Sequence, residues 1–200
     1  MSNSKDFDFV IYGATGFTGK LVVEYTLDKY LNVEDLSWAI AGRNVEKLES
    51  LKLELGLPSE IEIIEVDSED QASIDKLVQR TKCVLTTVGP YQLYGDKIVK
   101  TCIESGTDYL DLCGEVWWMN KIISKYSNHA KDSGSRVIFS CGFDSIPFDL
   151  GVMFVQEETM SKFKKYAPSV RGRVRVMDGE FSGGTAASMK ATMGALKTNP

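Results

Sequence analysis

Short apolar runs alternate with longer amphipathic stretches along most of this 200-residue chain. Such runs suit strands buried on both faces of a parallel sheet, and the stretches between them have the periodicity of helices. Alternating strands and helices indicate an α/β fold with a doubly wound parallel sheet and right-handed crossovers. The predicted strands span residues 7–12, 36–41, 61–66, 83–88, 109–112 and 136–141. The predicted helices span residues 15–30, 45–55, 71–80, 95–105, 116–131 and 151–163.

The first predicted strand leads into a turn with three glycines spaced three residues apart, Gly13, Gly16 and Gly19. Gly13 permits a sharp turn, Gly16 lets the backbone approach a pyrophosphate, and Gly19 lets the next helix pack closely on the strand. The positive dipole end of that helix would face the anion. A glycine-rich turn alone is a weak signal, and a purely structural turn is the alternative. The buried strand before it and the helical pattern after it favour dinucleotide binding in a Rossmann domain.

The end of the second predicted strand carries a basic residue, Arg43, with Lys47 one helical turn further on. In NAD-binding versions of this fold, an acidic residue near this point accepts hydrogen bonds from the adenosine ribose. A guanidinium cannot accept such a bond, but it can hold a 2′-phosphate in a bidentate manner. An ordinary solvated arginine at a helix start is the alternative. We favour the phosphate interpretation, and hence NADP over NAD.

Further cofactor contacts are expected where the third and fourth strands end, because ligands of open α/β sheets bind beyond the carboxyl ends of the strands. Asp67 and Ser68 follow the third strand, where an adenine edge would lie. Thr87, Gly89, Pro90 and Tyr91 follow the fourth strand and should flank the dinucleotide.

Candidate catalytic groups are the ionisable or hydroxyl side chains beyond the strand ends, namely Tyr91, Glu115, Asp144 and Ser145. Each could instead orient a loop, and for Asp144 and Ser145 we favour helix capping over chemistry. A Tyr-x-x-x-Lys pair, as short-chain dehydrogenases use, occurs only at Tyr25 and Lys29 on the first helix. That position is too early in the chain for such a role.

Composition and charge describe an ordinary globular chain. Apolar residues make up 43% and charged residues 26%, and the net charge of −5 gives no electrostatic reason to expect nucleic acid. The four cysteines form no C-x-x-C pair, and the single histidine, His129, has no second ligand at metal spacing. We therefore expect no disulfide framework and no metal. The polar N-terminus is unlike a signal peptide, which together with the reduced cysteines predicts a cytoplasmic chain.

The pattern changes after residue 150. We expect a dinucleotide-binding domain at 1–150, followed at 151–200 by a connecting helix and the beginning of an incomplete second domain. Residues 170–177 alternate in polarity, which predicts a strand with three arginines on one face. A nucleic-acid patch is one interpretation of these arginines, and a half-exposed strand with solvated charges is the favoured one. An incomplete domain would be poorly anchored, exchanged between chains or packed on a neighbour, so a homo-oligomer is one expected outcome.

Six motifs run in order along nearly the whole chain: G-A-T-G-F-T-G, A-G-R-N-x-x-K-L, T-V-G-P-Y-x-x-Y-G, D-Y-x-D-L-x-G-E, G-F-D-S-I-P-F-D-L-G and S-G-G-T-A-A-S-M. Together they resemble the saccharopine dehydrogenase-like oxidoreductases, in particular the branch with bacterial trans-acting enoyl reductases and eukaryotic saccharopine dehydrogenase-like proteins. The resemblance implies a second α/β domain over the nicotinamide and, in some relatives, association with lipid droplets or membranes. It does not transfer saccharopine as the substrate. It implies cofactor binding by Gly13, Ala14, Thr15, Gly16, Phe17, Thr18 and Arg43, with Gly89, Pro90 and Tyr91 near the nicotinamide.

We therefore expect an NADP-dependent oxidoreductase that transfers hydride to a carbonyl, imine or enoyl group of a small-molecule or lipid-like substrate. The cofactor supplies the hydride, and the protein positions and polarises the substrate. The alternative is an NAD(P)-binding scaffold or redox sensor without turnover, because the sequence shows no recognisable acid–base pair. For the full-length protein, peripheral attachment to a membrane or lipid droplet is part of the same expectation.

Overall fold

Six parallel strands form the centre of the protein in the computed structural model, which describes residues 5–31, 33–179 and 182–198. The strands lie in the order β3-β2-β1-β4-β5-β6. This order reverses direction between β1 and β4, so the topological switch point lies between those two strands. The expected doubly wound parallel sheet is confirmed. The strands are β1 (Phe9–Tyr12), β2 (Trp38–Gly42), β3 (Glu62–Glu65), β4 (Cys83–Thr86), β5 (Asp108–Asp111) and β6 (Val137–Ile138).

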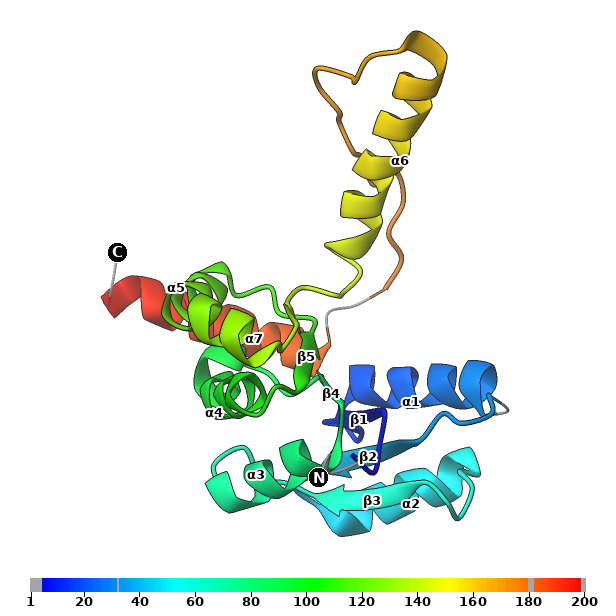
Figure 1. Cartoon of the computed structure of the whole chain (residues 1–200), viewed down its shortest axis with the longest axis vertical. Coiled ribbons are helices and arrows are strands. Elements are labelled where there is room, and N and C mark those ends of the chain that lie inside the picture. The colour runs from blue at the N-terminus through cyan, green and yellow to red at the C-terminus, as the bar shows by residue number, and fades with distance from the viewer. Residues whose placement is uncertain (1–4, 32, 180–181, 199–200) are drawn as a thin grey trace.

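Helices pack on both faces of this sheet (Figure 1). Each face has its own apolar core. Ile11 and Ile40 belong to the core under the first two helices, whereas Val10 and Ala39 belong to the core on the other face. The change of face between neighbouring residues follows from the two-residue period of a strand. The helices are α1 (Phe17–Tyr30) and α2 (Val45–Leu55) on the first face, and α3 (Gln71–Arg80), α4 (Tyr91–Glu104) and α5 (Val116–Ser133) on the second.

Several elements differ by a few residues from the bounds expected from the sequence, and for α4 and β6 the reason is visible in the structure. Helix α4 begins at Tyr91 rather than at residue 95, because a carboxylate from another loop binds its first N–H groups. Strand β6 ends at Ile138 rather than at residue 141. At Ser140 the backbone adopts a positive φ of 60°, and its N–H donates to the side chain of Asp111 instead of to a strand. Both differences come from contacts between segments far apart in the sequence.

The chain beyond β6 leaves the sheet. Helix α6 (Ile146–Phe163) extends away from it, and none of its residues is buried (Figure 1). The expected domain boundary between residues 150 and 151 lies within this helix. Helix α7 (Gly183–Thr198) returns to the side of the sheet that carries α4 and α5 (Figure 1). Within the described residues, no helix is both long and apolar enough to cross a bilayer.

The strand expected at 170–177 is wrong. These residues have no regular secondary structure, and Arg171, Arg173 and Arg175 are all exposed. Alternating polarity favours a strand only where a neighbouring strand can bond to its backbone. No strand of the described chain lies beside this segment, because the sheet ends at β3 and β6.

Candidate functional site

The glycine turn, residues 13–19, connects β1 to α1 at the switch point of the sheet. Gly13 has a φ of 91°, and a Cβ placed there would lie 2.7 Å from Thr87 Oγ1. A Cβ on Gly19 would lie 2.1 Å from the carbonyl oxygen of Gly13. The turn therefore needs glycine at its first and third positions for the two reasons expected, a left-handed backbone and close helix packing.

The start of α1 has no capping side chain, because Gly16 occupies its N-cap position. In contrast, Asn44 caps α2 by accepting the N–H of Lys47 at 2.8 Å, and Asp70 caps α3 through the N–H groups of Ala72 and Ser73. The first N–H groups of α1 thus remain available to an anion, and Thr15, Gly16 and Phe17 are exposed around them. Ala14 is buried beneath the turn, and Thr18 is half-buried. This open helix start fits the pyrophosphate of a dinucleotide.

Thr87 holds the glycine turn from the β4 side. Its N–H donates to the carbonyl oxygen of Tyr12 at 2.9 Å, and its hydroxyl donates to that of Gly13 at 3.1 Å. The side chain expected to contact the cofactor therefore also fixes the backbone that would bind the phosphates.

Three of the expected adenosine-side residues gather around Tyr12, where β1, β2 and β3 end. Burial raises the pKa of the Tyr12 phenol to about 12, and the neighbouring Ser68 and Arg43 oppose that rise while Asp67 adds to it. Arg43 is exposed and has no ion pair among the described residues. Lys47 is exposed in the first turn of α2. An anion next to Arg43 would therefore meet an unpaired guanidinium close to the start of a helix.

Glu115 fixes the beginning of α4. Its carboxylate is buried, with 6% of the residue exposed, and accepts the N–H of Tyr91 at 2.9 Å and that of Gln92 at 2.8 Å. Bonds to a carboxylate are charge-assisted, and the positive end of the helix dipole favours the charge. We expected Glu115 to be catalytic, and in the structure its carboxylate binds the first two N–H groups of α4, directly after Gly89 and Pro90. A catalytic role for Glu115 stays a prediction.

The Tyr91 hydroxyl lies in the core. It donates to the carbonyl oxygen of Thr86 at 3.2 Å and accepts the N–H of Leu112 at 3.5 Å, and its ring packs against Trp118. Burial raises the pKa of this phenol well above its usual value of 10. These contacts favour a supporting role over proton transfer, so a catalytic role for Tyr91 stays a prediction.

Asp144 and Ser145 lie in the segment between β6 and α6. Ser145 occupies the N-cap position of α6, but its side chain makes no capping bond. The side-chain capping that we favoured from the sequence is therefore wrong for Ser145. Asp144 is exposed and Ser145 is half-buried. Both side chains are therefore accessible to solvent, and their catalytic role stays a prediction.

Asp111 was missed by the sequence analysis. Its Oδ1 accepts the N–H groups of Cys113 at 2.9 Å and Ser140 at 3.0 Å, and its Oδ2 accepts the Tyr109 hydroxyl at 2.9 Å. This buried carboxylate ties the exit of β5 to that of β6. The one local sign was an acidic residue between two leucines in the strand expected at 109–112.

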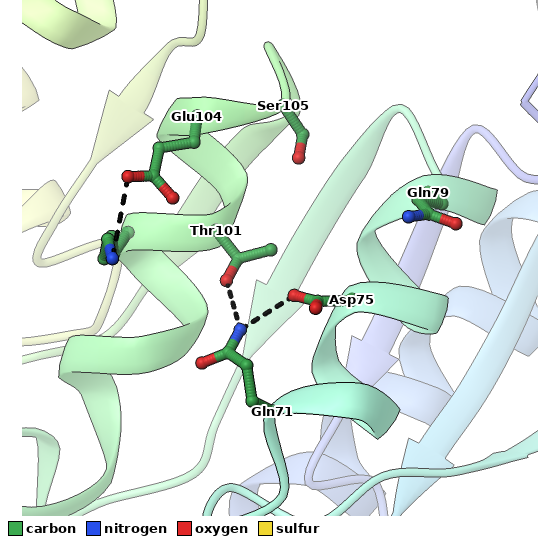
Figure 2. A pocket seen from close by; sticks show the side chains of 7 residues that line it. Gln71, Asp75, Gln79, Thr101, Glu104 and Ser105 are labelled. Carbon is green, nitrogen blue, oxygen red and sulfur yellow. Dashed lines mark hydrogen bonds and ion pairs between the residues drawn. The ribbon is translucent and has the colours of Figure 1, made fainter.

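A polar cavity of about 400 Å³ lies between α3 and α4, away from these residues (Figure 2). In it the Gln71 side-chain amide donates to Thr101 Oγ1 at 2.9 Å and to Asp75 Oδ1 at 2.7 Å. None of the expected site residues lines this cavity, so it is separate from the glycine turn.

Comparison with known proteins agrees with this geometry. Residues 9–138 match the family described as the saccharopine dehydrogenase NADP binding domain. The chain is 40% identical to the human saccharopine dehydrogenase-like oxidoreductase, over 78% of this chain and 39% of that protein. It is 40% identical to a lipid droplet localized protein of Caenorhabditis elegans, over 76% of this chain and 36% of that protein. A trans-acting enoyl reductase of Mycobacterium ulcerans is 39% identical, over 76% of this chain and 36% of that protein.

Two solved structures share the fold at low identity. The saccharopine dehydrogenase (L-Glu forming) of Saccharomyces cerevisiae superposes with a TM-score of 0.58 and 19% identity, over 74% of this chain and 30% of that one. A Citrobacter triphenylmethane reductase in complex with NADP(H) superposes with a TM-score of 0.51 and 19% identity, over 75% of this chain and 55% of that one. The chain spans less than half the length of the human, worm and Mycobacterium ulcerans relatives. From the match over residues 9–138, the chain belongs to the saccharopine dehydrogenase NADP-binding domain family.

Proposed function

We propose that this chain is the NADPH-binding part of an oxidoreductase that transfers hydride to a carbonyl, imine or enoyl group. The uncapped start of α1 behind the glycine turn carries this proposal, because it leaves free N–H groups where the pyrophosphate would lie. The names of the relatives support the reaction class, since they include an oxidoreductase and an enoyl reductase.

The preference for NADP over NAD rests on Arg43. Its guanidinium lies near Tyr12 at the end of β1, in the region where the adenosine ribose sits in this fold. No carboxylate of the described residues pairs with it, so it can hold a 2′-phosphate. Lys47 adds a second positive charge in the first turn of α2.

The chain's own residues then position the reaction. Bound NADPH would supply the hydride at the carboxyl end of β4. Glu115 holds the segment that contains Gly89 and Pro90, and the buried α4 start excludes water on that side. Ser145 has a hydroxyl that makes no capping bond and would donate to a substrate oxygen, and the exposed Asp144 carboxylate next to it would accept a hydrogen bond from the substrate.

We also propose that the substrate is lipid-like and that residues from about 151 onward begin a second domain that borders it. The worm relative named as lipid droplet localized supports a link to lipid. The exposed apolar side chains of α6 support a second domain, because they would otherwise face solvent.

A scaffold or redox sensor without turnover is the second candidate function. It is favoured by the buried states of Tyr91 and Glu115, whose polar atoms are bonded to backbone groups, so these two residues form no acid–base pair open to a substrate. Turnover separates the two functions. Loss of NADPH absorbance with a carbonyl or enoyl lipid, using full-length protein, would support the enzyme. Tight NADPH binding without oxidation across a broad panel would support the scaffold.

The cofactor preference is tested by Arg43→Asp. This change removes the phosphate partner and places a carboxylate beside the phosphate, which adds repulsion to the lost contact. Since charge-assisted bonds contribute about 1.5–3 kcal/mol each, NADPH affinity should fall roughly ten- to a hundredfold. NADH affinity should stay level or rise, because Asp can accept bonds from the free ribose hydroxyls.

The measurement is a calorimetric titration of both cofactors. Arg171→Asp is the matched control, since it makes the same charge change at an exposed position in the segment after α6. Equal affinity of the unmodified protein for NADH and NADPH, or equal weakening of both by Arg43→Asp, would contradict the role of Arg43.

A further inference from the structure

We propose that α7 forms one wall of the nicotinamide half of the cofactor site, with Ser188 as the residue that contacts the nicotinamide. This inference rests on the proposed NADPH binding. The observation behind it is a contact between segments about a hundred residues apart: a Cβ on Gly89 would lie 3.6 Å from Ser188 Oγ. Three residues after Gly89 and one helical turn after Ser188, the Gln92 side-chain amide donates to Thr192 Oγ1 at 3.5 Å.

The contact lies at the nicotinamide end because of the strand order. A dinucleotide crosses the switch point between β1 and β4, with its pyrophosphate at the glycine turn. Arg43 after β2 marks the adenosine side. Gly89 follows β4, on the opposite side of the turn, and Ser188 stands beside it.

The face that α7 turns toward this junction is polar. Ser188 and Thr192 are partly buried there, whereas Met189 and Met193 are exposed. A helix whose only role was packing would bury its large apolar side chains and expose its hydroxyls. Among the side chains of α7 that the structure describes the reverse holds, so α7 places the hydroxyl groups of Ser188 and Thr192 at the junction.

The hydroxyl of Ser188 is available to a ligand. Among the described residues it has no hydrogen-bond partner, whereas Ser182, at the start of α7, accepts the N–H of Thr185 at 3.2 Å and caps the helix. The contribution of α7 is thus a side-chain donor and not the helix dipole. A primary amide or carbonyl oxygen, as on the nicotinamide carboxamide, would accept from it.

The test compares two ligands that share the adenosine half of the site. Ser188→Trp should weaken NADPH binding more than tenfold, because the indole would fill the nicotinamide space beside Gly89. The affinity for 2′,5′-ADP, which lacks the nicotinamide, should change less than twofold.

Ser188→Ala should weaken NADPH binding roughly three- to tenfold, the value of one ordinary hydrogen bond, again without affecting 2′,5′-ADP. Met189→Trp, on the exposed face of α7, is the matched control and should change neither affinity.

The outcomes separate this inference from the proposed function. If both Ser188 variants bind NADPH as the unmodified protein does, or lose both ligands equally, the role of Ser188 is wrong while NADPH binding stands. If the unmodified protein binds neither ligand, the proposed function fails and this inference fails with it.

Discussion

Gly19 is the position in the glycine turn that tolerates least change. The nearest atoms to a Cβ there are backbone atoms of Gly13 and Ala14, which cannot rotate away as a side chain could. By comparison, a Cβ on Gly16 would meet only the Gly13 carbonyl oxygen, at 3.3 Å. The three glycines therefore differ in purpose, although their spacing in the sequence is uniform.

Gly19→Ala should displace α1 from β1. We expect a loss of stability of about 1–3 kcal/mol or more, the usual cost of overpacking, together with a loss of NADPH binding. Gly151→Ala is the control, because its Cβ would meet nothing within 4 Å. Inside α6 that change should raise helix propensity by about 0.5–1 kcal/mol. Urea denaturation and NADPH titration measure both effects, and unchanged binding in Gly19→Ala would contradict the close packing.

At the scale of elements, two buried carboxylates join segments that the sheet alone would leave separate. Glu115 fixes α4, and Asp111 joins β5 to the chain after β6. Burial raises the pKa of the Asp111 carboxyl above its usual 3.8, even though three bonds to its oxygens oppose the rise. The hydrogen bonds that Asp111 accepts therefore come at the cost of burying its charge.

The raised pKa of Asp111 predicts a pH-dependent difference between the protein and Asp111→Asn. The folded state binds the Asp111 proton more tightly than the unfolded state does. The stability that protonated Asp111 contributes is therefore complete below the unfolded pKa and is lost as pH rises through the folded pKa. Asparagine keeps an oxygen for the N–H groups of Cys113 and Ser140, and it cannot ionise. The unfolding free energy of Asp111→Asn minus that of the unmodified protein should therefore increase with pH above 3.8 and then level off.

Denaturation of both proteins between about pH 4 and 7 measures this difference and cancels the other titrating groups. A difference that decreases as pH rises would mean that the bonds to the ionised Asp111 outweigh its burial, and the assignment would be reversed.

At the scale of the whole molecule, α6 and the segment after it differ from the sheet domain in surface and charge. Residues 159–177 carry six basic residues and no acidic one, although the chain as a whole has a net charge of −5. Helix α6 exposes Leu150, Met153 and Phe154, the last at 64%. A contiguous apolar surface of this kind favours association with another surface.

We expect the 200-residue chain by itself to self-associate through α6 as its concentration rises. Leu150→Glu combined with Phe154→Glu should reduce this association, because the two side chains lie four residues apart on one helix face. Leu53→Glu is the control, since Leu53 is 83% exposed on α2, in a different part of the molecule. Sedimentation velocity over a range of concentrations is the measurement. A chain that stays monomeric throughout would show that the α6 surface has no such effect.

Local patterns in the sequence determined the parts of this protein that depend on neighbouring residues. Strand and helix periods identified the six strands and the helices around them, and helices α2 and α3 have the bounds expected from the sequence. The spacing of Gly13, Gly16 and Gly19 identified the turn, because the backbone angle of one residue and the packing of the next helix turn are local properties.

Only the tertiary structure decided features that depend on residues distant in the sequence. The start of α4 depends on Glu115, the end of β6 on Asp111, and the buried state of Tyr91 on β4 and the chain after β5. Residues 170–177 have the polarity of a strand but no neighbouring strand. The contact of Ser188 with Gly89 joins two segments that no local pattern relates. A strand needs a partner and a buried carboxylate needs donors, and the folded chain supplies both across distances that a sequence period cannot report.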